Sequence, residues 1–355
     1  MGRMTSSPLA PHPLVLRARR LADELLVPHG ERVDQEGVPA GHVEALKRSG
    51  LLGVSAPAAC GGAEAPVAVA REVAEILAGA CCATWFVQTQ HHTPVKLLSM
   101  AEGPVREEFL RPLATGEALA GIAYAHVRAF PRVPVRATAE RGGWRFDGVV
   151  PWYTGWGLND VMLLAGVNDA DEVVFACAGA REQPGMHASA PMRLAALTAA
   201  RTVTLTLDGL WLDEDAVVLR TPREEFARVD LPKNTNASPA VFGIAYAALG
   251  LLDGAAEAEE TADTLRGRID DVRRQAYELA DHPVPHEHIE ERLALKTRAY
   301  DLMRAATTAA VVAGGGRSLD LASRAQRLAR EGMFLLVQGQ TTEVRRAHLG
   351  ALAGA

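Results

Sequence analysis

The spacing of apolar residues changes twice along this chain of 355 residues, and this change constrains the fold more than any other feature. Over residues 13–118, and again from residue 238 onward, apolar side chains recur every three or four positions, as on one face of a helix. Between residues 119 and 222 they form short runs with a period near two, separated by Gly, Pro, Asn and Asp. No helix-length segment alternates with these runs, which favours an antiparallel β unit over a parallel sheet with crossover helices.

The pattern predicts a mainly α-helical protein with a central antiparallel β domain. We expect a helical N-terminal domain over residues 1–118, a β domain of sandwich or barrel type over 119–222, and a C-terminal helical domain over 223–355. The last domain carries helical segments of roughly twenty residues joined by short loops, which is typical of an antiparallel four-helix bundle. A hairpin is expected at Gly142 and Gly143. The predicted strands cover residues 118–124, 135–140, 144–150, 161–167, 173–178 and 202–207.

Composition narrows the class of partner. Aromatic residues make up 5% of the chain and apolar residues 48%, so the helix formers alanine and leucine supply most of the core. A net charge of −6 excludes the broad basic surface that nucleic-acid binding requires. The N-terminus lacks the apolar run of a signal peptide, and no apolar stretch is long enough for a membrane span. The four cysteines form no CxxC pair, and we therefore expect a soluble cytoplasmic protein without membrane contact.

Two histidine-containing segments could carry chemistry. In DHPVPHEHIEER, His282, His286 and His288 lie among acids, but the intervening prolines interrupt any helical face. We expect this segment to cap the following helix and to hold no metal. His91 and His92 lie on an apolar helical segment, where adjacent side chains diverge by about 100°. At most one of the two can therefore face a pocket, and a core or interface position is the simpler interpretation of either.

The helical, β, helical order of the three regions, with particular residues at their boundaries, resembles the acyl-CoA dehydrogenase superfamily over nearly the whole chain, and three stretches carry the resemblance. The first is VVPWYTGWGLND, residues 149–160. The second is Gly250 followed sixteen residues later by Arg266. The third is VVAGGGRSLDLASRAQRLAREGMFLLVQGQTTEVRRAHL, residues 311–349. The resemblance implies an FAD-binding protein with a helical N-terminal domain, a β middle domain and a C-terminal four-helix bundle.

The resemblance also implies residues at the flavin ring. Trp152 matches the family tryptophan that packs beside the flavin, and Thr154 matches the threonine that contacts the ring. Thr341 falls where the family places a further threonine near the flavin. These types suit the task, because an isoalloxazine needs a flat apolar neighbour and its N5 needs a hydrogen-bond partner.

Other matches concern the pyrophosphate and the approach of the backbone to the cofactor. Arg266 resembles the arginine that grips the pyrophosphate across a subunit boundary, although the family's Phe-Gly after it is replaced by Ile269 and Asp270. Gly314 and Gly315 match the Gly-Gly pair that lets the backbone approach the cofactor. The Arg-acid step that follows in the family corresponds to Arg330 and Glu331.

The catalytic glutamate of the family has no counterpart here. Its usual position, two residues before the threonine, is Gly339, and no carboxylate lies between residues 231 and 252, where other members carry it. The nearest acid to the first position is Glu343. The flavin-side loop of the family is also altered and reads Tyr124, Ala125, His126. Glu343, Tyr124 and His126 are therefore the candidates for acid–base catalysis.

The resemblance implies an FAD-dependent oxidoreductase that oxidises an acyl thioester, as acyl-CoA or carrier-bound acyl, or a related small substrate. Two alternatives stay open. A monooxygenase of the same fold that takes reduced flavin needs no such base, and ATWFVQTQHH, residues 83–92, is similar to its helix with a substrate-side histidine. A non-catalytic subunit of a heteromeric dehydrogenase would also lack the base. The family binds flavin between subunits, which implies a homo-oligomer, dimer or tetramer, or a hetero-oligomer with a homologous chain.

Overall fold

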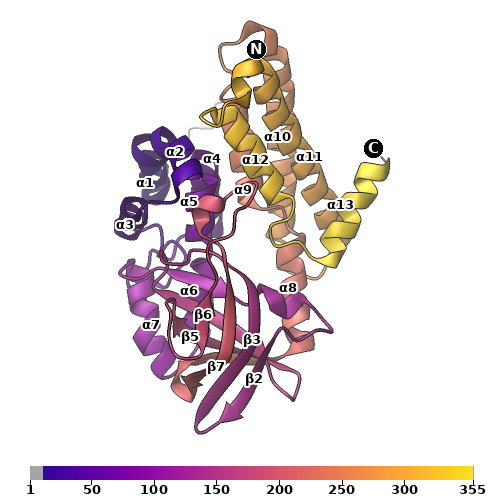
Figure 1. The fold of residues 1–355 in the computed structure, drawn as a ribbon. Helices are drawn as coiled ribbons and strands as arrows, with labels where there is room; N and C mark the ends of the chain where they lie inside the picture. Colours follow the sequence, from indigo (N-terminus) through magenta and orange to yellow (C-terminus); the bar gives the residue numbers. More distant parts are fainter. Residues whose placement is uncertain (1–10, 355) are drawn as a thin grey trace.

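The computed structural model describes residues 11–354, in which N-terminal helices and a C-terminal helical bundle lie side by side next to a central sheet (Figure 1). The first two helices are joined without a break by a π-helical turn, Ala22–Leu26. The N-terminal helices are α1 (Pro13–Leu21), α2 (Val27–Glu36), α3 (Ala40–Ser49), α4 (Val67–Ala80), α5 (Cys82–Thr89), α6 (His92–Met100) and α7 (Pro104–Thr115).

The central sheet has eight strands, and all six predicted strands are among them. The order is β6-β7-β3-β2-β4-β5-β8, with β1 beside β4. The expected hairpin joins β2 and β3 at the Gly142 turn. Short β6 and β8 were not predicted. The strands are β1 (Ala120–Ala123), β2 (Val135–Glu140), β3 (Gly143–Tyr153), β4 (Val161–Val167), β5 (Glu172–Gly179), β6 (Met186–Ala188), β7 (Val203–Asp213) and β8 (Val217–Pro222).

The expectation of a purely antiparallel β domain is wrong, because the sheet is mixed. β4 runs parallel to β1 and also to β2. β3 runs antiparallel to β2, and the chain then turns back into β4. β4 therefore has the same direction as β1 and β2, and no helix is needed to connect them. All seven residues of β4 are buried, since Met162 and Leu164 pack into a core with β3 and β7 while Val161 and Leu163 pack against α6 and α7. β4 is therefore covered on one face by β3 and β7 and on the other face by the N-terminal helices α6 and α7.

The predicted helical bundle is confirmed, but its helices differ widely in length. α9 has 11 residues and α11 has 26, against the roughly twenty expected of each. One hydrophobic core runs without interruption from the N-terminal helices into the bundle. The helices of this part are α8 (Arg223–Thr235), α9 (Pro239–Leu249), α10 (Glu259–Ala280), α11 (Ile289–Gly314), α12 (Arg324–Leu335) and α13 (Thr342–Gly354).

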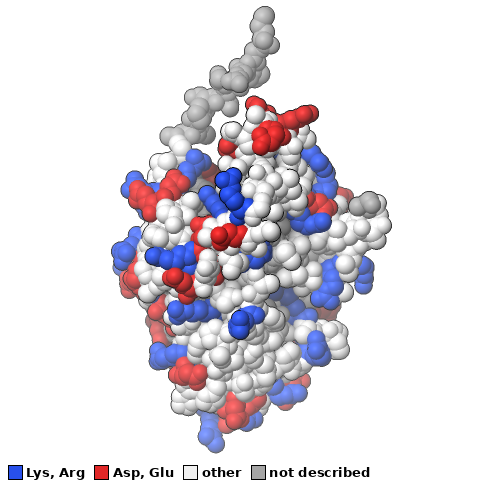
Figure 2. Space-filling view, turned by 45° about the horizontal axis from the view of Figure 1, so that its top comes forward, with Lys and Arg blue, Asp and Glu red and all other residues white. Residues whose placement is uncertain are grey.

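The surface agrees with the modest net charge of the chain. Figure 2 shows acidic and basic side chains intermixed over the face that it presents. None of the helices in residues 11–354 is long and apolar enough to span a membrane.

Candidate functional site

The C-terminal end of β3 presents an indole to solvent on a rigid support. Trp152 is 57% exposed, while its neighbour Tyr153 is fully buried, as strand alternation requires. The Tyr153 hydroxyl accepts a hydrogen bond from Asn159 Nδ2 at 3.1 Å, and the same amide donates to the Thr154 carbonyl at 2.9 Å. The Thr154 and Thr202 hydroxyls lie 3.1 Å apart. The buried contacts of Tyr153 and Asn159 therefore hold Trp152 and Thr154 in place.

The altered flavin-side loop is enclosed by protein. Tyr124 is 8% exposed and packs edge-to-face on Phe175, and burial raises the pKa of its hydroxyl. His126 Nε2 donates to the Ala165 carbonyl at 2.9 Å, and burial lowers the pKa of this imidazole to about 4. His126 Nδ1 is buried without a partner among the described residues. Both side chains are uncharged at neutral pH and neither lines the two cavities described below.

The third group of candidates lies around α13. Gly339 has φ +63°, and the Thr341 hydroxyl accepts a hydrogen bond from the Val344 amide at 3.3 Å, which caps the helix. Glu343, in the first turn, is exposed, whereas Val344 is buried. The structure thus places Glu343 on the solvent side of α13 and uses Thr341 as a helix cap.

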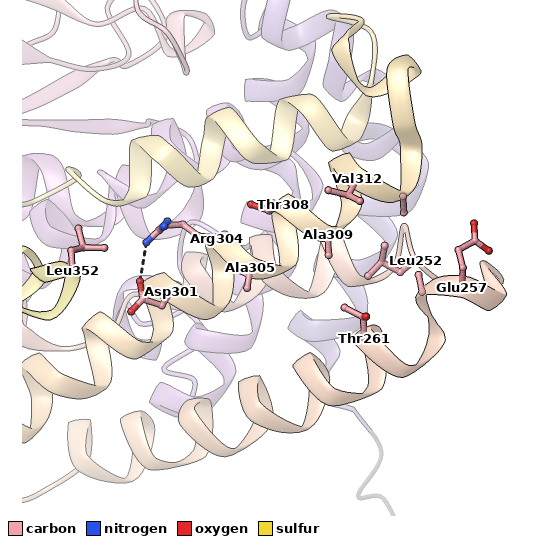
Figure 3. A pocket seen from close by; sticks show the side chains of 12 residues that line it. Leu252, Glu257, Thr261, Asp301, Arg304, Ala305, Thr308, Ala309, Val312 and Leu352 are labelled. Atoms are coloured by element: carbon pink, nitrogen blue, oxygen red, sulfur yellow. Dashed lines mark hydrogen bonds and ion pairs between the residues drawn. The ribbon is translucent and has the colours of Figure 1, made fainter. Parts of the chain in front are cut away.

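A cavity of about 750 Å³ is lined by residues of α10, α11 and α13 and of the segment between α9 and α10 (Figure 3). Arg266, 40% exposed in its side chain, lies 3.2 Å from Asp253 and is not among the residues that line this cavity. The lining contains one cation, Arg304, which is paired with Asp301 at 3.0 Å. The whole lining comprises Leu252, Glu257, Ala258, Thr261, Asp301, Arg304, Ala305, Thr308, Ala309, Val312, Ala313 and Leu352.

Gly314 and Gly315 close α11 at one end of this cavity. Gly315 has φ +58°, which favours glycine, whereas a Cβ at Gly314 would lie 2.1 Å from Ser318 Oγ, a contact that rotation of the serine side chain relieves. The conformation of Gly315 is explained by the turn after α11.

A second cavity, of about 210 Å³, lies between α4, α5 and the start of α6 and α9. Its polar groups are His92, Gln88, Arg71 and Ser55. Gln88 Nε2 lies 2.7 Å from His92 Nε2, so the amide donates and the imidazole proton is on Nδ1. Burial lowers the pKa of His92 to about 4, which keeps it neutral. The remaining wall is Val54, Ala70, Val73, Ala74 and Pro239.

The charge of this small cavity is balanced at its rim. Arg71 donates to both carboxylate oxygens of Asp281 at 2.8 and 2.6 Å and lies over the Tyr277 ring. No carboxylate is among the lining residues. Pro239 opens α9 within the segment where the resemblance placed an alternative glutamate. The cavity therefore adjoins that position and presents a neutral imidazole.

His91, in contrast, is part of the core. Its Nδ1 accepts from the Ala120 amide at 3.0 Å and its Nε2 donates to the Leu113 carbonyl at 3.2 Å. The expectation that at most one of the two histidines faces a pocket is confirmed. Gln88 and Arg71 were missed by the sequence analysis; the spacing of Gln88 four residues before His92 was a usable signal, whereas Arg71 had none.

The long C-terminal match carries a buried ion pair. Arg327 donates to Glu331 at 2.9 Å, and both side chains are buried, at 0% and 2% exposure. Glu331 also accepts from the Cys82 amide at 3.2 Å, and Arg327 contacts Glu31 of α2 at 3.1 Å. Glu331 therefore pairs with Arg327, one turn before it, while its neighbour Arg330 reaches Asp34. This network fixes α12 to α2 and to the start of α5.

The buried histidines predict a pH dependence of stability. Burial lowers the pKa of His91 to about 3 and that of His126 to about 4, against 6.5 in the unfolded chain. The unfolded state thus binds protons first, so stability is complete above about pH 6.5 and falls toward pH 4, by up to about 1.4 kcal/mol per pH unit for each histidine. Urea unfolding at pH 7 and pH 5 measures this, and His126→Asn, which cannot titrate, should reduce the slope. An unchanged slope in that variant would contradict the assignment.

Comparison with known proteins agrees with this architecture. Residues 13–117 match the family model described as acyl-CoA dehydrogenase, N-terminal domain. No curated protein matches the chain in sequence. Butyryl-CoA dehydrogenase from Megasphaera elsdenii has a TM-score of 0.80 at 16% identity, covering 96% of this chain and 97% of that one. A structure described as PigA with FAD and proline has a TM-score of 0.82 at 14% identity, covering 98% and 99%.

A further protein of similar structure is named as a monooxygenase. Dibenzothiophene monooxygenase (TdsC) from Paenibacillus sp. A11-2 has a TM-score of 0.73 at 17% identity, covering 94% of this chain and 95% of that one. The fold is therefore shared over nearly the full length, and the N-terminal domain is matched by its family model. Residues 13–117 of this chain thus match the acyl-CoA dehydrogenase N-terminal domain in sequence, and the chain as a whole has the fold of the acyl-CoA dehydrogenases.

Proposed function

We propose that this protein is an FAD-dependent oxidoreductase that acts on the uncharged end of a small substrate held in the cavity beside His92. The observation that carries the proposal is Trp152, a large indole left 57% exposed on a strand end whose neighbours are locked. Isolated apolar side chains on a surface need no explanation, but this one stands where the resemblance places the flavin ring. Two proteins of the same fold, one named with FAD and proline and one a butyryl-CoA dehydrogenase, support the choice of cofactor and substrate size.

The residues at the end of β3 fit the flavin ring. Arg266 fits the pyrophosphate if it gives up its contact with Asp253. Trp152 offers a flat apolar face, and Thr154 directly follows β3, with its hydroxyl 3.1 Å from that of Thr202, directly before β7. Arg266 is paired with Asp253 in an exposed contact, which is worth at most about 1 kcal/mol and can be exchanged for a phosphate. Bound FAD would supply a hydride acceptor.

The small cavity limits what the substrate can present. The cavity, at about 210 Å³, is smaller than the roughly 300–1,000 Å³ usual for small-molecule pockets, so only a short group enters. Both terminal nitrogens of Arg71 are taken by Asp281, which leaves no free charge for a substrate carboxylate. The His92 Nδ1–H is available as a donor to a substrate oxygen. In this proposal His92 orients that oxygen. An acid–base role for Glu343, Tyr124 or His126 stays a prediction.

A second candidate, the reduced-flavin monooxygenase, is favoured by one observation. The cavity lining has no carboxylate that could remove an α proton, and its titratable group is a neutral histidine. A similar structure is a dibenzothiophene monooxygenase. Hydroxylation by reduced flavin and O2 needs no α-proton base, so the lining is compatible with it.

The experiment that tests these proposals is spectroscopic. Purified protein equilibrated with FAD should show a bound flavin spectrum that bleaches anaerobically on addition of butyryl-CoA. Oxygen consumption that depends on added reduced flavin would select the monooxygenase instead. Flavin binding only after addition of a second homologous chain would select the non-catalytic subunit. Protein that takes up no flavin under any of these conditions would refute all three, and light scattering of the same sample measures the expected oligomer.

Trp152 gives this proposal a residue-level prediction. Trp152→Ala should weaken FAD binding about tenfold, equivalent to roughly 1.4 kcal/mol, because the ring loses its stacking partner. Trp152→Phe should retain most of the affinity. Trp211→Ala is the matched control, since Trp211 is a similarly exposed indole, at 44%, on neighbouring β7. Flavin fluorescence quenching measures all three, and equal losses in the Trp152→Ala and Trp211→Ala variants would argue against a ring site at Trp152.

A further inference from the structure

The connection between α10 and α11 folds back so that three potential metal ligands meet. The ligand atoms of His282, Glu287 and His288 all lie within 4.8 Å of one another. Glu287 Oε2 is 3.8 Å from His282 Nδ1 and 4.0 Å from His288 Nε2. We propose that this triad is a Zn²⁺ site, with two imidazoles and one carboxylate as ligands and water in the fourth position.

The ligand chemistry suits zinc. Imidazole nitrogen and carboxylate oxygen are usual zinc donors at about 2.0–2.2 Å, so the three side chains need only close by small rotations onto a common centre. The two imidazole rings are already in contact, with centroids 4.9 Å apart. His282 Nδ1 presently accepts from the Val284 amide at 3.3 Å, a long contact that the metal would replace.

The hydrogen bonding of His288 is that of a metal ligand. Its Nδ1 lies 3.4 Å from Glu291 Oε1, where it donates, and this leaves the lone pair of Nε2 facing Glu287. Histidines that bind metals commonly donate their second ring N–H to a carboxylate, which fixes the tautomer and raises the basicity of the ligand nitrogen. Glu291 thus supplies the outer partner that the site requires.

The backbone around the triad is already restricted, so metal binding costs little conformational entropy. Pro283 and Pro285 fix φ at two positions between the ligands, and His288 has φ +61°. The prolines were the reason to expect no metal here, because they break a helical face. In the folded chain they bend the loop instead, and the three ligands meet across that bend.

The local charge permits a cation. The N-terminus of α11 opposes one through its dipole, but Glu287, Glu290 and Glu291 lie at or beside that end. Of the nearby basic side chains, Arg228 is directed to His286 and Glu225. Arg292 donates to the Glu287 main-chain carbonyl at 3.1 Å and to Asn236, not to the ligand atoms of the triad. The acidic side chains therefore outweigh the dipole at this position.

A metal here would strengthen the junction of the two longest bundle helices. α10 and α11 end and begin at this loop, and Asp281, next to His282, holds Arg71 at the rim of the small cavity. An ion that binds only the folded chain stabilises it in proportion to the logarithm of its concentration over the dissociation constant. The expected consequence is a rise in melting temperature on addition of zinc.

The test uses the full chain stripped of metal with a chelator and titrated with ZnCl2. Calorimetry should give one Zn²⁺ per chain, thermal unfolding should shift upward, and Co²⁺ should give the visible bands of a tetrahedral site. His282→Ala combined with His288→Ala should weaken binding at least tenfold and abolish the thermal shift. Glu287→Gln should weaken it less.

His286→Ala is the matched control, because His286 lies in the same loop outside the triad, and this variant should bind zinc as the unaltered chain does. All positions are in an exposed loop, and circular dichroism verifies that each variant is folded. Absence of zinc binding to the unaltered chain, or binding that survives the double substitution, would overturn the proposal, as would binding lost through His286→Ala. None of these results depends on flavin, so they are independent of the proposed oxidoreductase activity.

Discussion

Replacing Arg327 by methionine is expected to lower the free energy of unfolding by about 3–5 kcal/mol. The guanidinium is fully buried and donates to Glu331, to Glu31 and to the Ala80 carbonyl. Methionine fills part of the volume but leaves the Glu331 carboxylate buried with no counter-ion. Urea unfolding followed by circular dichroism measures the loss.

A double variant separates the buried charge from the packing. If Glu331 is replaced by leucine together with Arg327→Met, much of the lost stability should return, because removal of both charges of a buried pair is often neutral. Arg330→Met is the comparison on the same helix. It should cost less, since the Arg330 side chain is 20% exposed whereas Arg327 is fully buried, although its partner Asp34 is only 7% exposed. A double variant as unstable as Arg327→Met alone would show that packing, not charge, carries the effect.

Gly243→Ala is expected to destabilise the protein by about 1–3 kcal/mol through overpacking. A Cβ at Gly243 of α9 would lie 2.2 Å from the Glu75 carbonyl oxygen of α4, and one at Gly79 would lie 2.5 Å from the Gly243 carbonyl. These contacts are between backbones and cannot be relieved by a rotamer change. Since Ala74 and Pro239 on the same two helices line the small cavity, the variant should also distort that cavity.

Gly267→Ala is the matched control for this effect. Gly267 lies within α10 with nothing within 4 Å of its ideal Cβ, so alanine there should raise stability by about 0.5–1 kcal/mol through helix propensity. The same chemical change is thus expected to act with opposite signs at the two sites. Unfolding curves with shifts of equal sign would contradict the close approach of α4 and α9.

Much of the fold could be predicted from local patterns. The alternation that predicted six strands is imposed by burial of one or both sheet faces, and it is present in the residues themselves. β6, with three residues, was too short to show a period, and the second half of β8, which reads Arg220, Thr221 and Pro222, has no apolar alternation. The parallel pairing of β4 with β1 was missed because strand direction depends on which strands become neighbours in space.

The proposed three-domain division stays a prediction. A single core of buried residues joins helices from the first 118 residues to those of the bundle. Boundaries drawn from changes in periodicity mark where the type of secondary structure changes. They do not mark where the contacts between parts are weakest.

Recognition of the candidate site was uneven for a similar reason. The segment containing Trp152 and Thr154 is contiguous, so its character was visible in twelve residues of sequence. The small cavity draws Arg71, Gln88, His92 and Pro239 from α4, α5, α6 and α9. Nothing in the spacing of these residues indicates that they meet.

The amino-acid sequence by itself determined the type and succession of the elements, because helix and strand periods are properties of neighbouring residues. It also determined the likeness of individual segments to the superfamily. Only the tertiary structure decided that His92 faces a cavity while His91 is in the core, that Glu331 pairs with Arg327, and that His282 meets His288. Burial and ion pairing depend on which distant segments come into contact, and the packing of the whole chain sets those contacts.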